Sequence, residues 1–191
     1  MKKAQFKPNT TVAAIIEQNG KFLLVEEVTE HGNRYNQPAG HLEDGETLMQ
    51  AVIRETMEEA AYEFTPEFLL GVYQWKHAHN DITYLRFAFI GKAGRHYPMQ
   101  ELDDGILQAV WMGVDEMRDK AGLMRSPQVL TCVEDYLAGK RFSLKVITNL
   151  WVSLNNIYPP LLRGRARVGV VLASIDLCTP IPTFPLKGGG V

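Results

Sequence analysis

Three glutamates lie close together on one predicted helix, and their carboxylates are the groups in this sequence best suited to chemistry. Glu55 and Glu59 are four residues apart, so they lie one turn apart on the same side of a helix, with Glu58 in the same arc. Carboxylates this close repel one another, which indicates that a cation binds among them. Ligands that offer only oxygen suit a hard divalent ion, here Mg²⁺ or Mn²⁺. The alternative is a solvated acidic helix face.

Two further features fit a ligand site at this helix. Arg54 precedes Glu58 by four residues and is expected to pair with it, so that it orients one carboxylate while the others face the metal. Upstream, Gly40 and Gly45 allow the loop backbone to turn sharply and to approach a ligand closely. We therefore expect the loop and the helix to form one site.

The glutamate helix is predicted to begin near Thr47 and to pack on a sheet. We expect an apolar stripe on the side of the helix away from the glutamates to pack on the sheet. The stripe consists of Met49, Ile53, Met57 and Ala60. Other apolar residues lie on the carboxylate side one to two turns earlier, where a neighbouring element should cover them: Leu48, Ala51 and Val52.

The rest of the first 148 residues alternates between strand and helix patterns. Asn19-Gly20 between two apolar runs predicts a hairpin of residues 11–17 and 21–27. An extended segment at residues 35–39 contains Pro38, and Thr65-Pro66 should end any helix. Further strands are predicted at residues 68–76, 82–91, 107–112 and 141–147. Helices are predicted at residues 114–120 and 127–138, closed by Gly122 and Gly139 respectively.

Charged residues outside the helix add candidates for the site. Arg86 lies within an apolar strand pattern and needs a partner there, either a phosphate or the carboxylate of a structural salt bridge. The acidic loop at residues 100–105 offers three candidates for an extra carboxylate, each of which has a solvated loop side chain as its alternative: Glu101, Asp103 and Asp104.

Length, charge and cysteine content exclude several classes of protein. The chain has 191 residues, 46% of them hydrophobic, which suits one globular domain with an appendage. A net charge of −2 indicates no nucleic-acid partner, and no apolar run is long enough to be a membrane span or signal peptide. Cys132 and Cys178 lack metal-ligand spacing, so we expect a cytoplasmic protein, with Cys132 in the core.

Composition changes near residue 149 and predicts a domain boundary there. Residues 149–191 contain five prolines, a closing run of three glycines, and four basic residues against one acidic. No motif occurs in this tail. We predict one domain at residues 1–148 and a basic tail at 149–191 that is dispensable for chemistry.

The stretch from Gly40 to Tyr62 resembles the signature of the Nudix hydrolases. Six positions match its spacing, which chance would produce on the order of once in 10⁵ sequences of this length: Gly40, Glu46, Arg54, Glu55, Glu58 and Glu59. Three positions depart from the pattern, namely Thr56, Ala61 and Tyr62. Ala61 replaces the glycine that closes the family's helix, which should cost about 1 kcal/mol if the backbone is left-handed there.

The resemblance implies a fold, a reaction and a set of site residues. The fold is α/β (α+β), with a mixed sheet sandwiched between helices (α/β/α). The reaction is metal-dependent hydrolysis of a phosphoanhydride bond in a small molecule. Glu55, Glu58, Glu59 and the Gly40 carbonyl are carried over as metal ligands, and Glu58 and Arg54 as catalytic residues, with Glu58 either a third ligand or the general base.

Further matches between residues 6 and 147, including Gln74-Trp75 and Arg125-Ser126-Pro127, look like the bacterial phosphatase NudJ subgroup. That likeness implies a monomeric phosphatase acting on nucleoside di- and triphosphates and on the pyrophosphates of thiamine and its hydroxymethylpyrimidine precursor. The candidates for substrate binding are Arg86, Arg34, Tyr35, Gln37 and Trp75, with Tyr84 and Arg125 as further choices. Two alternatives stay open: a Nudix pyrophosphohydrolase for sugar nucleotides or oxidised nucleotides, and a non-catalytic nucleotide-binding module.

Overall fold

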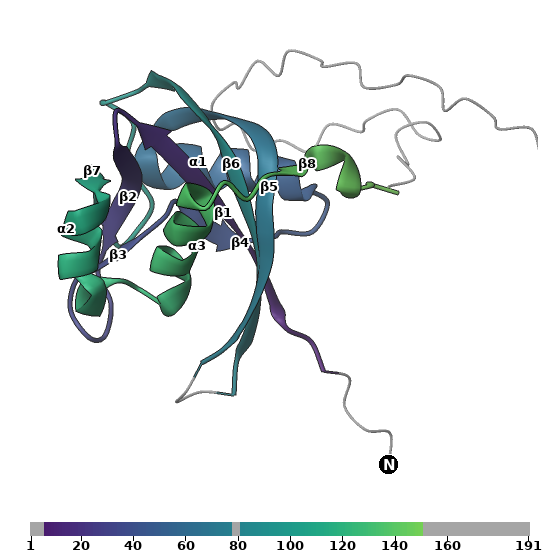
Figure 1. Cartoon of the computed structure of the whole chain (residues 1–191), viewed down its shortest axis with the longest axis horizontal. Coiled ribbons are helices and arrows are strands. Elements are labelled where there is room, and N and C mark those ends of the chain that lie inside the picture. The colour runs from purple at the N-terminus through teal and green to yellow at the C-terminus, as the bar shows by residue number, and fades with distance from the viewer. Residues whose placement is uncertain (1–5, 78–80, 151–191) are drawn as a thin grey trace, which may run out of the picture. The chain divides into compact units, whose positions relative to one another are not determined.

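The computed structural model describes residues 6–77 and 81–150 of the chain (Figure 1). Residues 1–150 form one compact unit, and residues 151–191 are a second. The predicted tail therefore lies outside the described residues except for residues 149 and 150, and so does Cys178.

Eight strands form one mixed sheet around the hairpin of β1 (Asn9–Gln18) and β2 (Lys21–Glu27). Asn19 and Gly20 both have positive φ, 54° and 77°, which confirms the Asn-Gly turn. The order is β3-β2-β1-β6-β5-β8, with β4 paired to β1 and β7 to β2, and only β1 and β6 run parallel. The other strands are β3 (Arg34–Asn36), β4 (Ala39–His41), β5 (Tyr62–Lys76), β6 (Thr83–His96), β7 (Ile106–Gly113) and β8 (Phe142–Ser143).

The glutamate helix α1 (Leu48–Ala60) begins where the sequence predicts. Thr47 is its N-cap and accepts a hydrogen bond from the Gln50 N–H, while the Gln50 side chain accepts one from the Thr47 N–H. The helix ends at Ala61, whose φ of 56° and ψ of 31° are left-handed, so the condition for a strained alanine is met. Strand β5 starts immediately afterwards at Tyr62, so the prediction that it begins at residue 68 is wrong: Pro66 lies within this long strand.

Helices α1 and α3 (Pro127–Leu137) cover opposite faces of the sheet, which confirms the α/β/α arrangement (Figure 1). One core contains Val52, Val12 and Phe89 under α1. The other contains Val129, Cys132 and Val133 of α3 together with Met117 of α2 (Val114–Asp119). Cys132 is fully buried in this second core, as expected.

The face of α1 that packs on the sheet differs from the predicted apolar stripe. The buried residues are Ala51, Val52, Glu55, Thr56 and Ala60, whereas Ile53 is 38% exposed. The stripe prediction is therefore confirmed for Ala60, which is buried, and for Met49, which packs against the same core, but it is wrong for Ile53. Glu55 on the carboxylate side is itself turned toward the sheet. The expectation that a neighbouring element covers Ala51 and Val52 is confirmed, because that element is the sheet itself.

Two local predictions near the end of the described unit also need correction. Gly122 does not close a helix but lies inside a 3₁₀ turn, η1 (Ala121–Leu123), and the last predicted strand is reduced to β8 and a second turn, η2 (Leu144–Val146).

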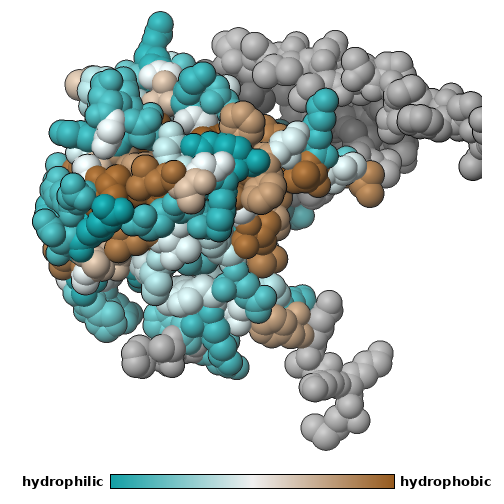
Figure 2. All heavy atoms as spheres, viewed as in Figure 1, coloured by the Kyte–Doolittle hydropathy of each residue, from teal (hydrophilic) through white to brown (hydrophobic). Residues whose placement is uncertain are grey.

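Apolar side chains gather over β5 and β8 in Figure 2, where Phe68, Val72 and Phe142 are partly exposed. None of the helices in residues 6–77 and 81–150 is long and apolar enough to cross a membrane.

Candidate active site

Glu55 and Glu59 reach from α1 to the short strand β4. The Glu55 carboxylate lies against Gly40, and a Cβ at residue 40 would collide with its carboxyl carbon and both of its oxygens. Glu59 Oε2 accepts a hydrogen bond of 2.7 Å from the Ala39 N–H. The absence of a side chain at Gly40 therefore lets α1 bring two carboxylates onto one short stretch of backbone.

Arg54 ties the other carboxylates to the loop. Its Nη2 lies 2.7 Å from Glu46 Oε1, and its Nη1 lies 2.8 Å from Glu55 Oε1 and 2.9 Å from Glu58 Oε2. Nη2 also donates to the His41 carbonyl at 3.0 Å. These hydrogen bonds raise the pKa of Arg54, with Glu46 the largest contributor, so the guanidinium stays charged. The predicted Arg54–Glu58 pair is present.

Burial and mutual repulsion hold two of the glutamates toward their neutral forms. Burial is the main cause that raises the pKa of Glu59 to about 8, and the charges of Glu55, Glu27 and Asp103 raise it further. Burial also raises the pKa of Glu55, against the lowering effect of Arg54. Both shifts mean that this site is short of positive charge when no cation is bound.

Asp103 is the residue of the acidic loop that lies nearest to the cluster. Its N–H donates to the Glu58 carbonyl at 3.0 Å, which docks the loop beside α1, and its charge raises the pKa of both Glu55 and Glu59. Glu101 and Asp104 are exposed, and neither is among the charges that shift these two glutamates.

These residues fit a hard divalent cation by their chemistry. The Glu59 carboxylate accepts a hydrogen bond from the backbone N–H of Ala39, and the Glu55 carboxylate lies against the next residue, Gly40. A bound cation would compensate the crowding of negative charge that raises both pKa values. Among residues 6–77 and 81–150, no three His, Cys, Asp or Glu side chains are arranged to hold a metal ion as they stand, and Arg54 occupies one oxygen each of Glu55 and Glu58.

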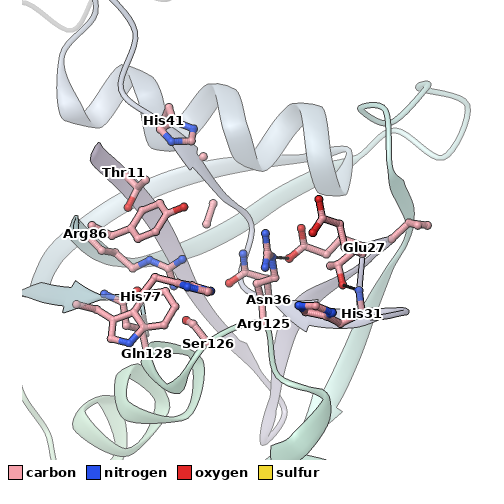
Figure 3. Close-up of a pocket in the computed structure, with 17 residues that line it drawn as sticks. Thr11, Glu27, His31, Asn36, His41, His77, Arg86, Arg125, Ser126 and Gln128 are labelled. Carbon is pink, nitrogen blue, oxygen red and sulfur yellow. Dashed lines mark hydrogen bonds and ion pairs between the residues drawn. The ribbon is translucent and has the colours of Figure 1, made fainter. Parts of the chain in front are cut away.

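A pocket of about 580 Å³ lies next to β4 (Figure 3). Residues of β4 line it, including Ala39 and Gly40, so it adjoins the glutamate cluster directly. Trp75 and Tyr84 line it as well, and their rings stack with centroids 5.7 Å apart and an interplanar angle of 21°. Such a pair offers a flat aromatic surface for a planar ligand.

The structure brings two of the five predicted substrate residues to this pocket, Arg86 and Trp75. Gln37 is buried behind the lining, where it donates to the Val129 carbonyl at 2.8 Å and accepts from Arg86 Nη1 at 3.4 Å. Tyr35 and Arg34 are not lining residues either. The Tyr35 ring packs beneath Lys120 Nζ at 5.5 Å, and Arg34 donates to the carbonyl of the preceding residue.

Several lining residues were not singled out as site residues from the sequence. Glu27 forms an ion pair of 3.2 Å with Arg125, and burial raises its pKa. Asn36 and Ser126 are both nine-tenths buried. The Arg125 N–H donates to the Tyr35 carbonyl at 2.8 Å, and this hydrogen bond joins the segment that contains Ser126 to the strand that contains Asn36. The segment around Ser126 is 90 residues from Asn36 in sequence, so only the strand-to-loop pairing reveals this contact.

Comparisons with known proteins agree with this geometry. A family profile described as NUDIX domain matches residues 6–131. Phosphatase NudJ of Shigella boydii serotype 4 is 38% identical over 142 residues, which cover 74% of this chain and 92% of that protein. Among solved structures, a NUDIX hydrolase from Nitrosomonas europaea is 49% identical with a TM-score of 0.74, covering 75% of this chain and 97% of that one.

A more distant structure shows likeness of fold alone. It is a bifunctional NMN adenylyltransferase/ADP ribose pyrophosphatase from Francisella tularensis, solved with AMP and a Mn ion. It is 21% identical, with a TM-score of 0.58, and the match covers 71% of this chain and 43% of that one.

Proposed function

Because this chain belongs to the NUDIX family of hydrolases, we propose that it removes phosphate from nucleoside di- and triphosphates and from the pyrophosphates of hydroxymethylpyrimidine and thiamine. The observation that carries the proposal is the contact between the glutamate cluster and the pocket. A single strand, β4, is touched by Glu55 and Glu59 from α1 and also lines the pocket with the stacked Trp75 and Tyr84. Similarity to Phosphatase NudJ supports phosphate release as the reaction.

We propose that Glu55, Glu58, Glu59 and the Gly40 carbonyl hold Mg²⁺ or Mn²⁺. When bound, such a cation neutralises phosphate oxygens and raises the acidity of a coordinated water molecule. Asp103 is the member of the acidic loop best placed to add a carboxylate, since it alone of the three candidates acts on Glu55 and Glu59. Glu101 and Asp104 remain weaker candidates for that role.

Glu58 and Arg54 divide the remaining chemical work in this proposal. The Glu58 side chain is 38% exposed, more than that of Glu55 at 9%, so it can take a proton from water and release it to solvent. Arg54 positions Glu58 and Glu55 through hydrogen bonds of 2.9 and 2.8 Å and anchors both to the loop through Glu46. Truncation of Arg54 should therefore disturb both carboxylates.

The organic part of the substrate is proposed to lie in the pocket. Trp75 and Tyr84 would stack on its ring, and Arg86 would bind an anionic group. Gln37 acts indirectly, because it holds the Arg86 guanidinium from behind. Arg34 and Tyr35 adjoin the lining residue Asn36 and would contact only substrate groups outside the pocket.

The protein is further proposed to act as a cytoplasmic monomer on small molecules, without a nucleic-acid partner. Its net charge of −2 gives no electrostatic footprint for nucleic acid. Analytical ultracentrifugation of the full chain at micromolar concentration checks the oligomeric state, and a concentration-dependent dimer would contradict the proposal.

Phosphate release tests the function directly. The panel holds a nucleoside triphosphate, a nucleoside diphosphate, hydroxymethylpyrimidine pyrophosphate, thiamine pyrophosphate and ADP-ribose, each measured with Mg²⁺ and with chelator. Metal-dependent release of orthophosphate from the first four, with ADP-ribose untouched, is the expected result. Hydrolysis of ADP-ribose gives AMP and ribose 5-phosphate and no orthophosphate, so for this substrate AMP is measured. AMP from ADP-ribose without turnover of the other four would replace the proposal with a pyrophosphohydrolase, and ligand binding without any turnover would leave a binding module.

Two substitutions test the assigned residues. Glu55→Gln and Glu59→Gln keep the shape of the side chain but remove the charge, so both should lose most turnover even at saturating Mg²⁺. A variant of either kind with near wild-type turnover would contradict the metal-ligand roles.

A further inference from the structure

Ser126 is the N-cap residue of α3, but its hydroxyl caps nothing. The side chain makes no capping hydrogen bond, and Pro127 at the first helical position has no N–H to offer. Ser126 is 7% exposed, lines the pocket, and its Oγ has no hydrogen-bond partner within the described residues. The uncapped N-terminus of an 11-residue helix therefore faces the pocket with a free hydroxyl beside it.

Arg86 reaches the same pocket from β6 (Figure 3). It is 7% exposed, its Nε has no partner within the described residues, and its recorded hydrogen bond, from Nη1 to Gln37 Oε1, is long at 3.4 Å. No carboxylate of residues 6–77 and 81–150 forms an ion pair with it. Of the two alternatives for Arg86, the structural salt bridge is therefore absent from that part of the chain, and a buried guanidinium without an anion is unfavourable.

The neighbouring charges do not remove this need. Glu27 also lines the pocket, but it is engaged by Arg125 at 3.2 Å. Burial lowers the pKa of Arg86, and the opposing effects of Cys132, Glu59 and Glu27 do not offset it. Glu30, Tyr84 and three histidines complete the set of titratable lining residues, the histidines being His31, His41 and His77.

Unsatisfied polar atoms are concentrated at this one pocket. Four buried side-chain atoms in the described parts of the chain lack both a hydrogen-bond and an ion-pair partner, and all four belong to residues that line it: Thr11 Oγ1, Asn36 Oδ1, Arg86 Nε and Ser126 Oγ. Buried polar groups in native proteins are normally satisfied. Their concentration here indicates that a polar ligand completes the pocket.

We propose that Arg86, Ser126 and the N-terminal turn of α3 form a subsite for a phosphate-type oxyanion, separate from the position beside Glu55 and Glu59. The guanidinium, the hydroxyl and the helix N-terminus each favour negative charge, and within the described residues no lining carboxylate forms an ion pair with Arg86. The inference deepens the proposed function by adding a second anion position to the same pocket. The oxyanion is either a further phosphate of the substrate or free orthophosphate.

Orthophosphate binding to the metal-free protein tests the subsite without turnover. With chelator present, the crowded carboxylates repel phosphate, so binding must occur elsewhere. We expect orthophosphate to raise the Tm of the wild-type chain saturably. Ser126→Ala should weaken phosphate affinity about tenfold, and Arg86→Gln should abolish the shift, because each removes a donor to a charged ligand.

Arg95→Gln is the charge-matched control, since Arg95 is exposed and lies 6.0 Å from the Tyr97 ring. It should bind phosphate as the wild type does. If Arg86→Gln fails to fold, Ser126→Ala alone decides the outcome. Absence of a saturable shift in the wild type, or an unchanged affinity in Ser126→Ala, overturns the subsite, whether or not the chain proves to be a phosphatase.

Kinetics with Mg²⁺ then identifies the source of the oxyanion. If the substrate supplies it, Ser126→Ala raises KM for a nucleoside triphosphate about tenfold and changes kcat little. If free orthophosphate supplies it, KM is unchanged, and inhibition by added orthophosphate weakens about tenfold. Both results support the subsite, and a variant with unaltered KM and unaltered inhibition contradicts it.

Discussion

Gly40→Ala is the substitution that most directly tests how the glutamate cluster is held. The added Cβ would occupy the space of the Glu55 carboxylate, which lies against this backbone position. The colliding atoms are the carboxyl carbon and oxygens at the end of a flexible side chain, so Glu55 can swing away without moving the backbone. Residue 40 is not among those with positive φ, so alanine fits its conformation.

The expected cost therefore falls on activity and not on folding. Restoring van der Waals contact requires the carboxylate to move by roughly 1 Å or more, and a displacement of that size in an active site costs about 10²-fold in rate. That factor corresponds to about 2.7 kcal/mol of transition-state stabilisation. The free energy of unfolding should change by less than about 1 kcal/mol, because the lost Glu55–Arg54 hydrogen bond is partly offset by a less flexible unfolded chain.

Two assays separate these effects. Orthophosphate release at saturating Mg²⁺ gives kcat, and urea unfolding gives the free energy. Gly122→Ala is the matched control, because a Cβ there meets nothing within 4 Å, and it should leave both quantities unchanged. Near wild-type kcat in a folded Gly40→Ala protein would refute the placement of Glu55 against Gly40, and loss of the folded state would refute the claim that the side chain yields.

Four further predictions concern the backbone at Ala61, the protonation of Glu59 and the tail at residues 149–191. Ala61→Gly should lower the free energy of unfolding in urea by about 1–2 kcal/mol less than Ala60→Gly does. Both substitutions remove a buried methyl group, but only residue 61 has a left-handed backbone, which glycine adopts without strain. Equal losses of unfolding free energy would contradict this. Mg²⁺ affinity, measured by calorimetry, should rise with pH up to about 8, because burial raises the Glu59 pKa to about 8 and the cation must displace that proton. In the metal-free protein, the stability contributed by neutral Glu59 is fully present below about pH 4.5 and is lost as the pH rises through about 8; Glu59→Gln should flatten this slope, and an unchanged slope would count against the shift. A chain ending at Thr148 should keep wild-type turnover, and a folded but inactive product would show that residues 149–191 take part.

Structural features that depend on residues close together in the sequence could be predicted. The Asn19-Gly20 turn, the start of α1 at its capping threonine and the Arg54–Glu58 pair each depend on residues no more than four positions apart. Such patterns act through local backbone geometry, which is the same in any fold. The left-handed Ala61 is also of this kind, because the expected glycine position revealed it.

Structural features that depend on contacts between residues far apart in the sequence could not be predicted. The predicted helix stripe was right for Met49 and Ala60 but wrong for Ile53, and it left out the buried Thr56, because spacing alone does not show which face of α1 meets the sheet. Ser126 and Asn36 meet only because the segment after η1 pairs with β3. Strand β5 passes through Pro66, which local rules treat as a breaker, because its long antiparallel pairing with β6 supplies the compensating contacts.

The burial of the glutamates depends both on their spacing in the sequence and on contacts with residues distant in the sequence. Their spacing shows that three carboxylates share one side of a helix, but it does not show that two of them are buried against β4 while Glu58 stays open to solvent. What permits that difference at Glu55 is Gly40, which leaves room for the carboxylate against the strand. Gly40 also lines the pocket. A larger side chain at residue 40 would therefore displace a proposed metal ligand at the edge of the proposed substrate pocket, whatever the spacing of the glutamates.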